Sequence, residues 1–131
     1  MWYNLSMTEA DIIARWRKGA QDEIQAAKLL HDGGSQTSAL FHCHLSVEKA
    51  LKALYMEQHR KDAPFTHDLT KIALQLQRTW TDDEKQLLAD LSGFAVTARY
   101  DEPLWTENEA TESNVRLWIR KVEAFISSVL P

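Results

Sequence analysis

Apolar residues recur at intervals of three and four along most of this chain, and this spacing is the strongest constraint on its fold. Only 4 glycines and 3 prolines interrupt the pattern in 131 residues. Such intervals place side chains on one face of an α-helix. A half-buried strand would need strict alternation of apolar and polar residues, which no segment shows. The sequence therefore predicts an all-α protein.

Five helices follow from this periodicity and from the residues that begin and end helices. Thr8 with Asp11 forms an imperfect capping box, Gly33-Gly34 ends the first helix, and Pro103 prevents continuation of the fourth. Long antiparallel helices with short connections predict an up-and-down bundle of four to five helices, in one domain over residues 1–131. The expected helices are about Thr8–His31, Gln36–Gln58, a short helix from Thr66 or Asp68, a helix from the cap residue Thr81 to about Tyr100, and Asn108–Val129.

The second of these helices is apolar on two sides. A helix of this kind is either central in its bundle or contacts a partner. Between the two sides lie Glu48 and Lys52, spaced i,i+4 in the order that favours an ion pair. The main stripe consists of Leu40, Cys43, Val47, Ala50, Leu51 and Leu54. We expect the other side to form a dimer interface, with contacts from Phe41, Leu45 and Met56.

Charge and cysteine content narrow the function classes. A net charge of −4 argues against a protein that coats nucleic acid by bulk charge. The lone Cys43 lies in an apolar pattern, so we expect core packing and a reducing compartment, the cytoplasm. No stretch reaches the roughly 20 apolar residues of a membrane span, and the first residues do not read as a signal peptide. We therefore expect no membrane role.

The usual cofactor and metal motifs are absent from the sequence. There is no phosphate-binding GxxxxGK[ST] loop, no CxxC pair and no HExxH. His42 and His44 are two residues apart on a helix, so their side chains diverge by about 200° and cannot share a metal there. We expect neither a cofactor nor a metal site.

Three short stretches carry a more specific signal. They are Glu48-Lys49-Ala50-Leu51-Lys52-Ala53 in the second helix, Thr66-His67-Asp68-Leu69 after the loop, and Ala98-Arg99-Tyr100-Asp101 at the end of the fourth helix. In this order, and over about residues 8 to 129, they resemble the HEPN family. These are small helical domains of bacteria and archaea, often encoded beside minimal nucleotidyltransferases.

The resemblance implies a bundle of four or five helices that is usually a homodimer. Some family members are metal-independent RNases, often toxins of toxin–antitoxin pairs, and others are non-catalytic partners or nucleotide-binding modules. The RNases carry an arginine followed four to six residues later by a histidine, late in the chain. Arg99 matches that arginine, but no histidine follows it, because all five lie at or before His67.

Two functions therefore remain open. One is a dimeric module without catalysis of its own, which binds a nucleotide, RNA or a nucleotidyltransferase partner. The other is a metal-independent RNase that uses His67 with Arg60 or Arg99. Structural alternatives are a helix cap around His67 and an Arg99 that complements the helix dipole. The candidate ligand contacts are Lys49, Lys52, His67, Arg99 and Tyr100.

Overall fold

The computed structural model describes residues 7–100 and 103–131, without the side chains of Arg99 and Trp105. Within these residues the chain forms six helices and no strand, which confirms the predicted all-α bundle. The helices are α1 (Glu9–Asp32), α2 (Gln36–His59), α3 (Leu69–Ala73), α4 (Asp82–Tyr100), α5 (Pro103–Glu109) and α6 (Glu112–Val129).

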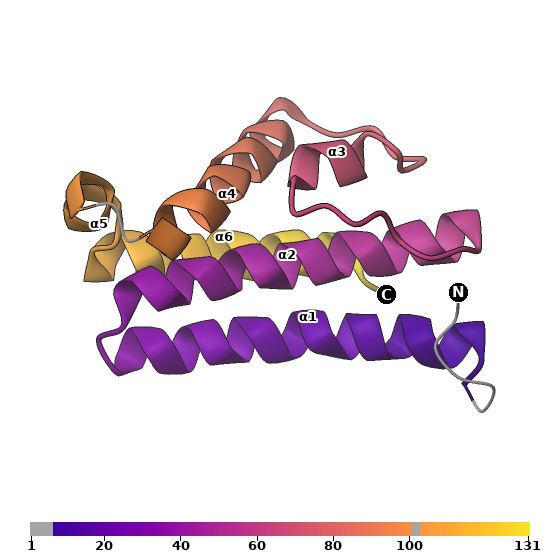
Figure 1. The fold of residues 1–131 in the computed structure, drawn as a ribbon, viewed down its shortest axis with the longest axis horizontal. Coiled ribbons are helices and arrows are strands. Elements are labelled where there is room, and N and C mark those ends of the chain that lie inside the picture. Colours follow the sequence, from indigo (N-terminus) through magenta and orange to yellow (C-terminus); the bar gives the residue numbers. More distant parts are fainter. Residues whose placement is uncertain (1–6, 101–102) are drawn as a thin grey trace.

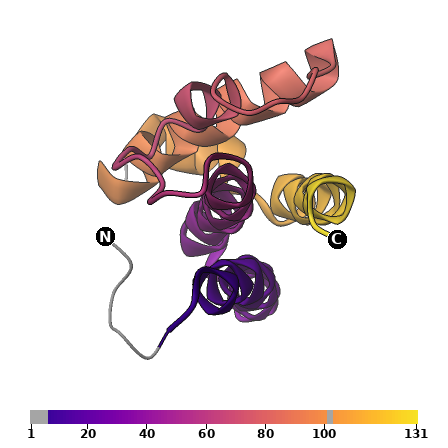
Figure 2. The same ribbon diagram turned by 90° about the vertical axis from the view of Figure 1, so that its right-hand side faces the viewer.

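Helix α2 lies at the centre of the bundle. Figure 1 shows α1, α2 and α6 lying along one another, with α4 inclined across α2. In the end view of Figure 2, α1, α6 and the α3–α4 pair surround α2, and α2 contacts all four of these helices. This position explains why the α2 sequence is apolar on more than one side.

Local signals in the sequence set most helix ends. The Thr8 side chain accepts from the Asp11 amide, and the Asp11 side chain accepts from the Thr8 amide, which completes the predicted capping box. Gly34 has a φ of 84°, a conformation that favours glycine and turns the chain from α1 into α2. Asp68 caps α3 through the Lys71 amide, so of the two predicted starts the second is correct.

The prediction of a helix break between Tyr100 and Asn108 was wrong, because helix α5 occupies Pro103–Glu109. Pro103 does not only stop a helix, because it is also the first residue of α5. A proline fits there, since the first turn of a helix leaves its amides unpaired. The last helix begins at Glu112 rather than Asn108, and the Thr111 side chain caps it by accepting from the Asn114 amide.

One apolar core joins the faces of α1, α2, α3, α4 and α6. Cys43 lies fully inside it, as predicted, and burial raises the pKa of its thiol to about 12. Trp80 completes the core beyond the end of α3. Its ring stacks on Phe125 and its Nε1 donates to the Ala73 carbonyl at 3.1 Å. The packed core holds α2 rigidly, so side chains on α2 have fixed positions.

Candidate functional site

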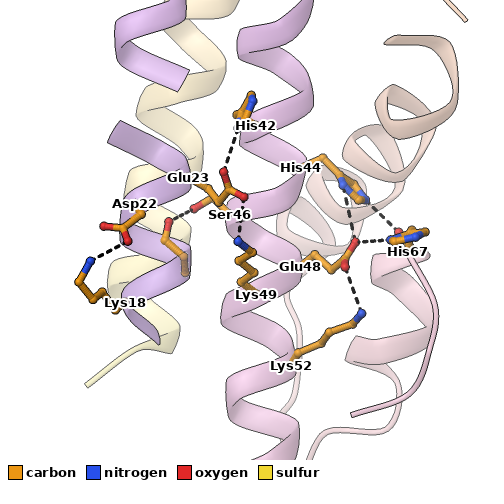
Figure 3. Close-up of polar contacts among 11 residues, drawn as sticks. Lys18, Asp22, Glu23, His42, His44, Ser46, Glu48, Lys49, Lys52 and His67 are labelled. Atoms are coloured by element: carbon orange, nitrogen blue, oxygen red, sulfur yellow. Dashed lines mark hydrogen bonds and ion pairs between the residues drawn. The ribbon is translucent and has the colours of Figure 1, made fainter. Parts of the chain in front are cut away.

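Two clusters of glutamate, histidine and lysine flank α2 (Figure 3). One faces α1 and contains Glu23, His42 and Lys49; we call it the Glu23 cluster. The other faces the loop between α2 and α3; we call it the Glu48 cluster. It contains His44, Glu48, Lys52 and His67. His44, Glu48 and Lys52 follow one another at intervals of four residues, so their side chains lie along one side of α2. The loop then brings His67, 19 residues beyond Glu48 in the sequence, against this helix.

Glu48 is the hub of the Glu48 cluster. Its Oε1 accepts from His67 Nδ1 at 2.9 Å, and its Oε2 accepts from Lys52 Nζ at 3.0 Å. Glu48 is 5% exposed and Lys52 is 7% exposed, so the ion pair is buried within one chain. Burying either charge alone would be costly, and pairing the two reduces that cost. Lys52 also lies 5.7 Å from the centre of the Trp16 ring.

His44 fixes the backbone of the loop. Its Nε2 donates to the carbonyl oxygen of His67 at 2.9 Å, because a carbonyl can only accept. In the neutral ring Nδ1 is then an unprotonated acceptor. Among the described residues it has no hydrogen-bond partner, and it lies 3.8 Å from Oε1 of Glu48. His44 is 1% exposed, and burial lowers its pKa, which favours this neutral form.

His67 is the exposed end of this cluster. Its side chain is 65% exposed, whereas Glu48 and His44, the two residues that hold it, lie on the buried side of α2. Both its ring and its carbonyl are bonded to α2, one turn apart. The arrangement presents an imidazole to solvent in a fixed orientation. That geometry suits a ligand contact or an acid–base group.

The Glu23 cluster contains the same kinds of polar group, but it lies at the packed interface between α1 and α2. Glu23 Oε1 accepts from His42 Nδ1 and Oε2 accepts from Lys49 Nζ, both at 2.9 Å. Burial raises the pKa of Glu23, but hydrogen bonds from Lys49 and His42 outweigh it, and the net pKa is lowered. A Cβ at Gly19 would lie 3.0 Å from the Lys49 side chain, so α1 and Lys49 are closely packed.

The structure separates the other predicted site residues. Arg60 caps the end of α2 and pairs with Glu9 at 2.6 Å. It lies twelve residues beyond Glu48 along α2, a rise of about 18 Å, so it does not meet His67. Arg99 and Tyr100 lie at the C-terminal end of α4, and Tyr100 is exposed. The side chain of Arg99 and the motif residue Asp101 lie outside the described residues.

The predicted dimer residues differ in what covers them. Phe41 and Leu45 are half-buried on α2 and keep surface for a partner. Met56 is 2% exposed and packs with Ile12 and Ile13 of α1. The contact expected from a second chain is therefore made to Met56 by its own chain.

Large exposed apolar side chains are more frequent between residues 65 and 104 than elsewhere in the described chain. Of the seven large apolar residues exposed in the described chain, five lie between residues 65 and 104. Phe65 is fully exposed, two residues from His67. The remaining four are Leu74, Val96, Tyr100 and Leu104.

Other places in the described chain offer less chemistry. A hollow of about 600 Å³ lies between the α1–α2 turn and α6, with Lys28, Arg116 and Arg120 facing Asp32, Glu112 and Glu123. Its opposite charges balance, so it does not favour an anion. No group of three metal-binding side chains occurs in the part of the chain that the structure describes. None of the helices searched there is long and apolar enough to cross a membrane.

Sequence reasoning missed the role of His44 and the contact between Glu48 and His67. The i,i+4 interval between His44 and Glu48 was visible, but a contact across 19 residues was not. It also did not single out Trp16 over Lys52 or the exposed Phe65 beside His67.

The fold and these motifs define a small helical-bundle protein whose central helix carries a buried glutamate. A model of the HEPN domain matches residues 13–130, and the chain belongs to the HEPN family. Among solved structures it is similar to TT1696 from Thermus thermophilus, with a TM-score of 0.73 and 19% identity. The match covers 90% of this chain and 98% of that one, and shows a shared fold. No curated protein matches.

Proposed function

We propose that this chain is a dimeric HEPN module that acts in the cytoplasm by binding and has no catalysis of its own. Its ligand is a nucleotide or RNA, bound beside His67. The observation that carries the proposal is that His67 is exposed on a buried polar frame, with Glu48 and His44 as its polar contacts in the described chain. The family RNases pair an arginine with a histidine that follows it, and no histidine follows Arg99 in this chain.

The paired lysines support binding at His67 rather than along α2. Lys49 and Lys52 were candidate ligand contacts, but Glu23 and Glu48 neutralise them. A charge that is already paired gains less from a phosphate than a free one does. Phe65 adds an exposed aromatic ring near His67, on which a base could stack.

The apolar surface supports a second protein chain. Phe41 and Leu45 would contact a second copy of the chain, while the exposed residues of α4 and α5 would suit a nucleotidyltransferase partner.

Titration calorimetry with common nucleotides and short RNAs tests the binding proposal, with sedimentation equilibrium for the dimer. We expect heat with at least one ligand, with an affinity about tenfold weaker in His67→Ala and unchanged in His42→Ala. No heat with any ligand, together with no complex with a nucleotidyltransferase encoded beside the gene, would sink the proposal.

One observation favours the RNase alternative. A carboxylate on Nδ1 of an exposed imidazole is an arrangement that general bases use. Incubation of RNA with the protein in chelator separates the two functions. Cleavage that disappears in His67→Ala or Arg99→Ala would make this chain an enzyme, and intact RNA leaves binding.

A further inference from the structure

Glu48 does more than neutralise a lysine. We propose that Glu48 is a positioning residue, which fixes His67 in one tautomer so that Nε2 faces outward to accept a hydrogen bond from a ligand hydroxyl. This inference rests on the proposed binding function. It adds the atom that makes the contact, the residue that aims it and the ligand group that it recognises.

The tautomer follows from the acceptor that faces the ring. A carboxylate has no proton to donate, so the 2.9 Å contact requires the proton on Nδ1 of His67. Lys52 Nζ donates to the other carboxylate oxygen at 3.0 Å, so both oxygens of Glu48 accept a hydrogen bond. In the neutral ring Nε2 is then the unprotonated nitrogen.

The orientation of the ring is fixed by a second bond. His44 donates to the carbonyl oxygen of His67 and so holds the backbone while Glu48 holds the ring. Both holding residues are almost completely buried in α2. A group held in its bound orientation loses less conformational freedom when a ligand arrives. Outer carboxylates orient histidines at metal sites in the same way.

The fixed tautomer selects the kind of group that can bind. An unprotonated Nε2 only accepts, so the ligand must donate a hydrogen. Phosphodiester oxygens do not donate, and the amino groups of the bases donate in RNA and DNA alike, whereas the ribose 2′-hydroxyl is a donor that only RNA carries. The site should therefore prefer a ribonucleotide strand to the deoxyribonucleotide strand of the same sequence.

Nitrogen-15 NMR of the histidine rings at about pH 8, above the ordinary titration range of histidine, tests the positioning role directly. In wild type we expect His67 with Nδ1 protonated and Nε2 unprotonated. The variant Glu48→Leu/Lys52→Leu removes both buried charges together and so avoids an unpaired one. In that variant the His67 signals should average between tautomers, and in the matched control Glu23→Leu/Lys49→Leu they should stay as in wild type. An averaged ring or a protonated Nε2 in wild type, or no change in Glu48→Leu/Lys52→Leu, overturns the proposal.

Binding of a short RNA and its DNA counterpart at the same pH tests the hydroxyl contact. We expect wild type to prefer RNA by about tenfold, the effect of one good hydrogen bond. The preference should fall to about one in Glu48→Leu/Lys52→Leu and persist in the Glu23→Leu/Lys49→Leu control. Equal binding of RNA and DNA by wild type overturns the hydroxyl contact. Binding of neither strand refutes the proposed function instead, and the NMR result still decides the role of Glu48.

Discussion

The Glu23 and Glu48 clusters contain the same bonds but occupy different places. In each, one carboxylate oxygen accepts from a histidine Nδ1 and the other from a lysine Nζ, at 2.9 to 3.0 Å. In the Glu23 cluster the histidine side chain is 29% exposed, and the glutamate comes from α1. In the Glu48 cluster the glutamate and lysine are buried, and the histidine is 65% exposed on a loop.

Under the proposed function, this difference separates a structural role from a ligand-binding one. The Glu23 cluster joins two helices that already pack along their length, so its polar atoms are used within the fold. In the Glu48 cluster, a buried ion pair holds the exposed ring of His67 in place. A buried ion pair is weak evidence for stability, because desolvation of its charges offsets their attraction. Its role here is to fix the position of a neighbouring side chain. The chemistry of two sites can therefore match while burial decides which one can act.

Removal of each glutamate should break the two clusters to different degrees. Glu48→Ala leaves Lys52 buried without a counter-charge, and we expect a loss of about 3–5 kcal/mol of unfolding free energy. Glu23→Ala leaves Lys49 a third exposed, and we expect about 1 kcal/mol. Urea unfolding of the two variants measures both values. Equal losses would mean that the burial of the Glu48 cluster has no energetic consequence.

An acidic residue on the open side of α2 should disrupt the proposed dimer. Leu45→Asp places a charge at the centre of the predicted interface, and we expect at least about 2 kcal/mol of lost association, or about thirtyfold in Kd. Ser127→Asp, at an exposed position of α6, is the matched control and should leave association unchanged. Sedimentation equilibrium gives both constants. A dimer that tolerates Leu45→Asp would place its interface elsewhere.

The buried His44 should make stability fall in acid. Burial lowers its pKa below 6.5 in the folded protein, so the unfolded chain binds more protons as pH falls through that value. The His44 contribution to stability is therefore present above about pH 6.5 and is lost below it. The loss is about 1.4 kcal/mol for each unit by which the folded-state pKa lies below the unfolded-state pKa. His44→Asn should show a smaller loss between pH 7.5 and 5.5 than wild type, as measured by urea unfolding. The same loss in both proteins would mean that His44 already carries its proton.

The helices were largely predictable because their signals are local. Spacings of three and four, the Thr8 and Thr81 capping boxes and the Gly33-Gly34 stop lie within a few residues of one another. Helix α5 was missed because Pro103 fits two positions, after a helix and at the start of one. A proline alone does not distinguish them.

The site was predictable only in part. The i,i+4 pair of Glu48 and Lys52 could be predicted, but its burial depends on Trp16 and on the loop that returns to α2. The sequence interval between Arg60 and His67 suggested a pair, yet the chain travels back along α2 in between and leaves them apart. Contacts formed by the fold carry no signature in the spacing of their residues.

The most direct test is the affinity of a short RNA for wild type, His67→Ala and His42→Ala, measured by fluorescence anisotropy in chelator. His67→Ala removes the histidine of the Glu48 cluster, and His42→Ala removes the histidine of the Glu23 cluster. Because the two clusters contain the same bonds, the variants differ in which side of α2 is altered. We predict that His67→Ala weakens binding by about tenfold, one hydrogen bond's worth, and that His42→Ala stays within about twofold of wild type, on the order of measurement error. Equal weakening by both variants, or none in His67→Ala, would contradict the assignment of function to the Glu48 cluster.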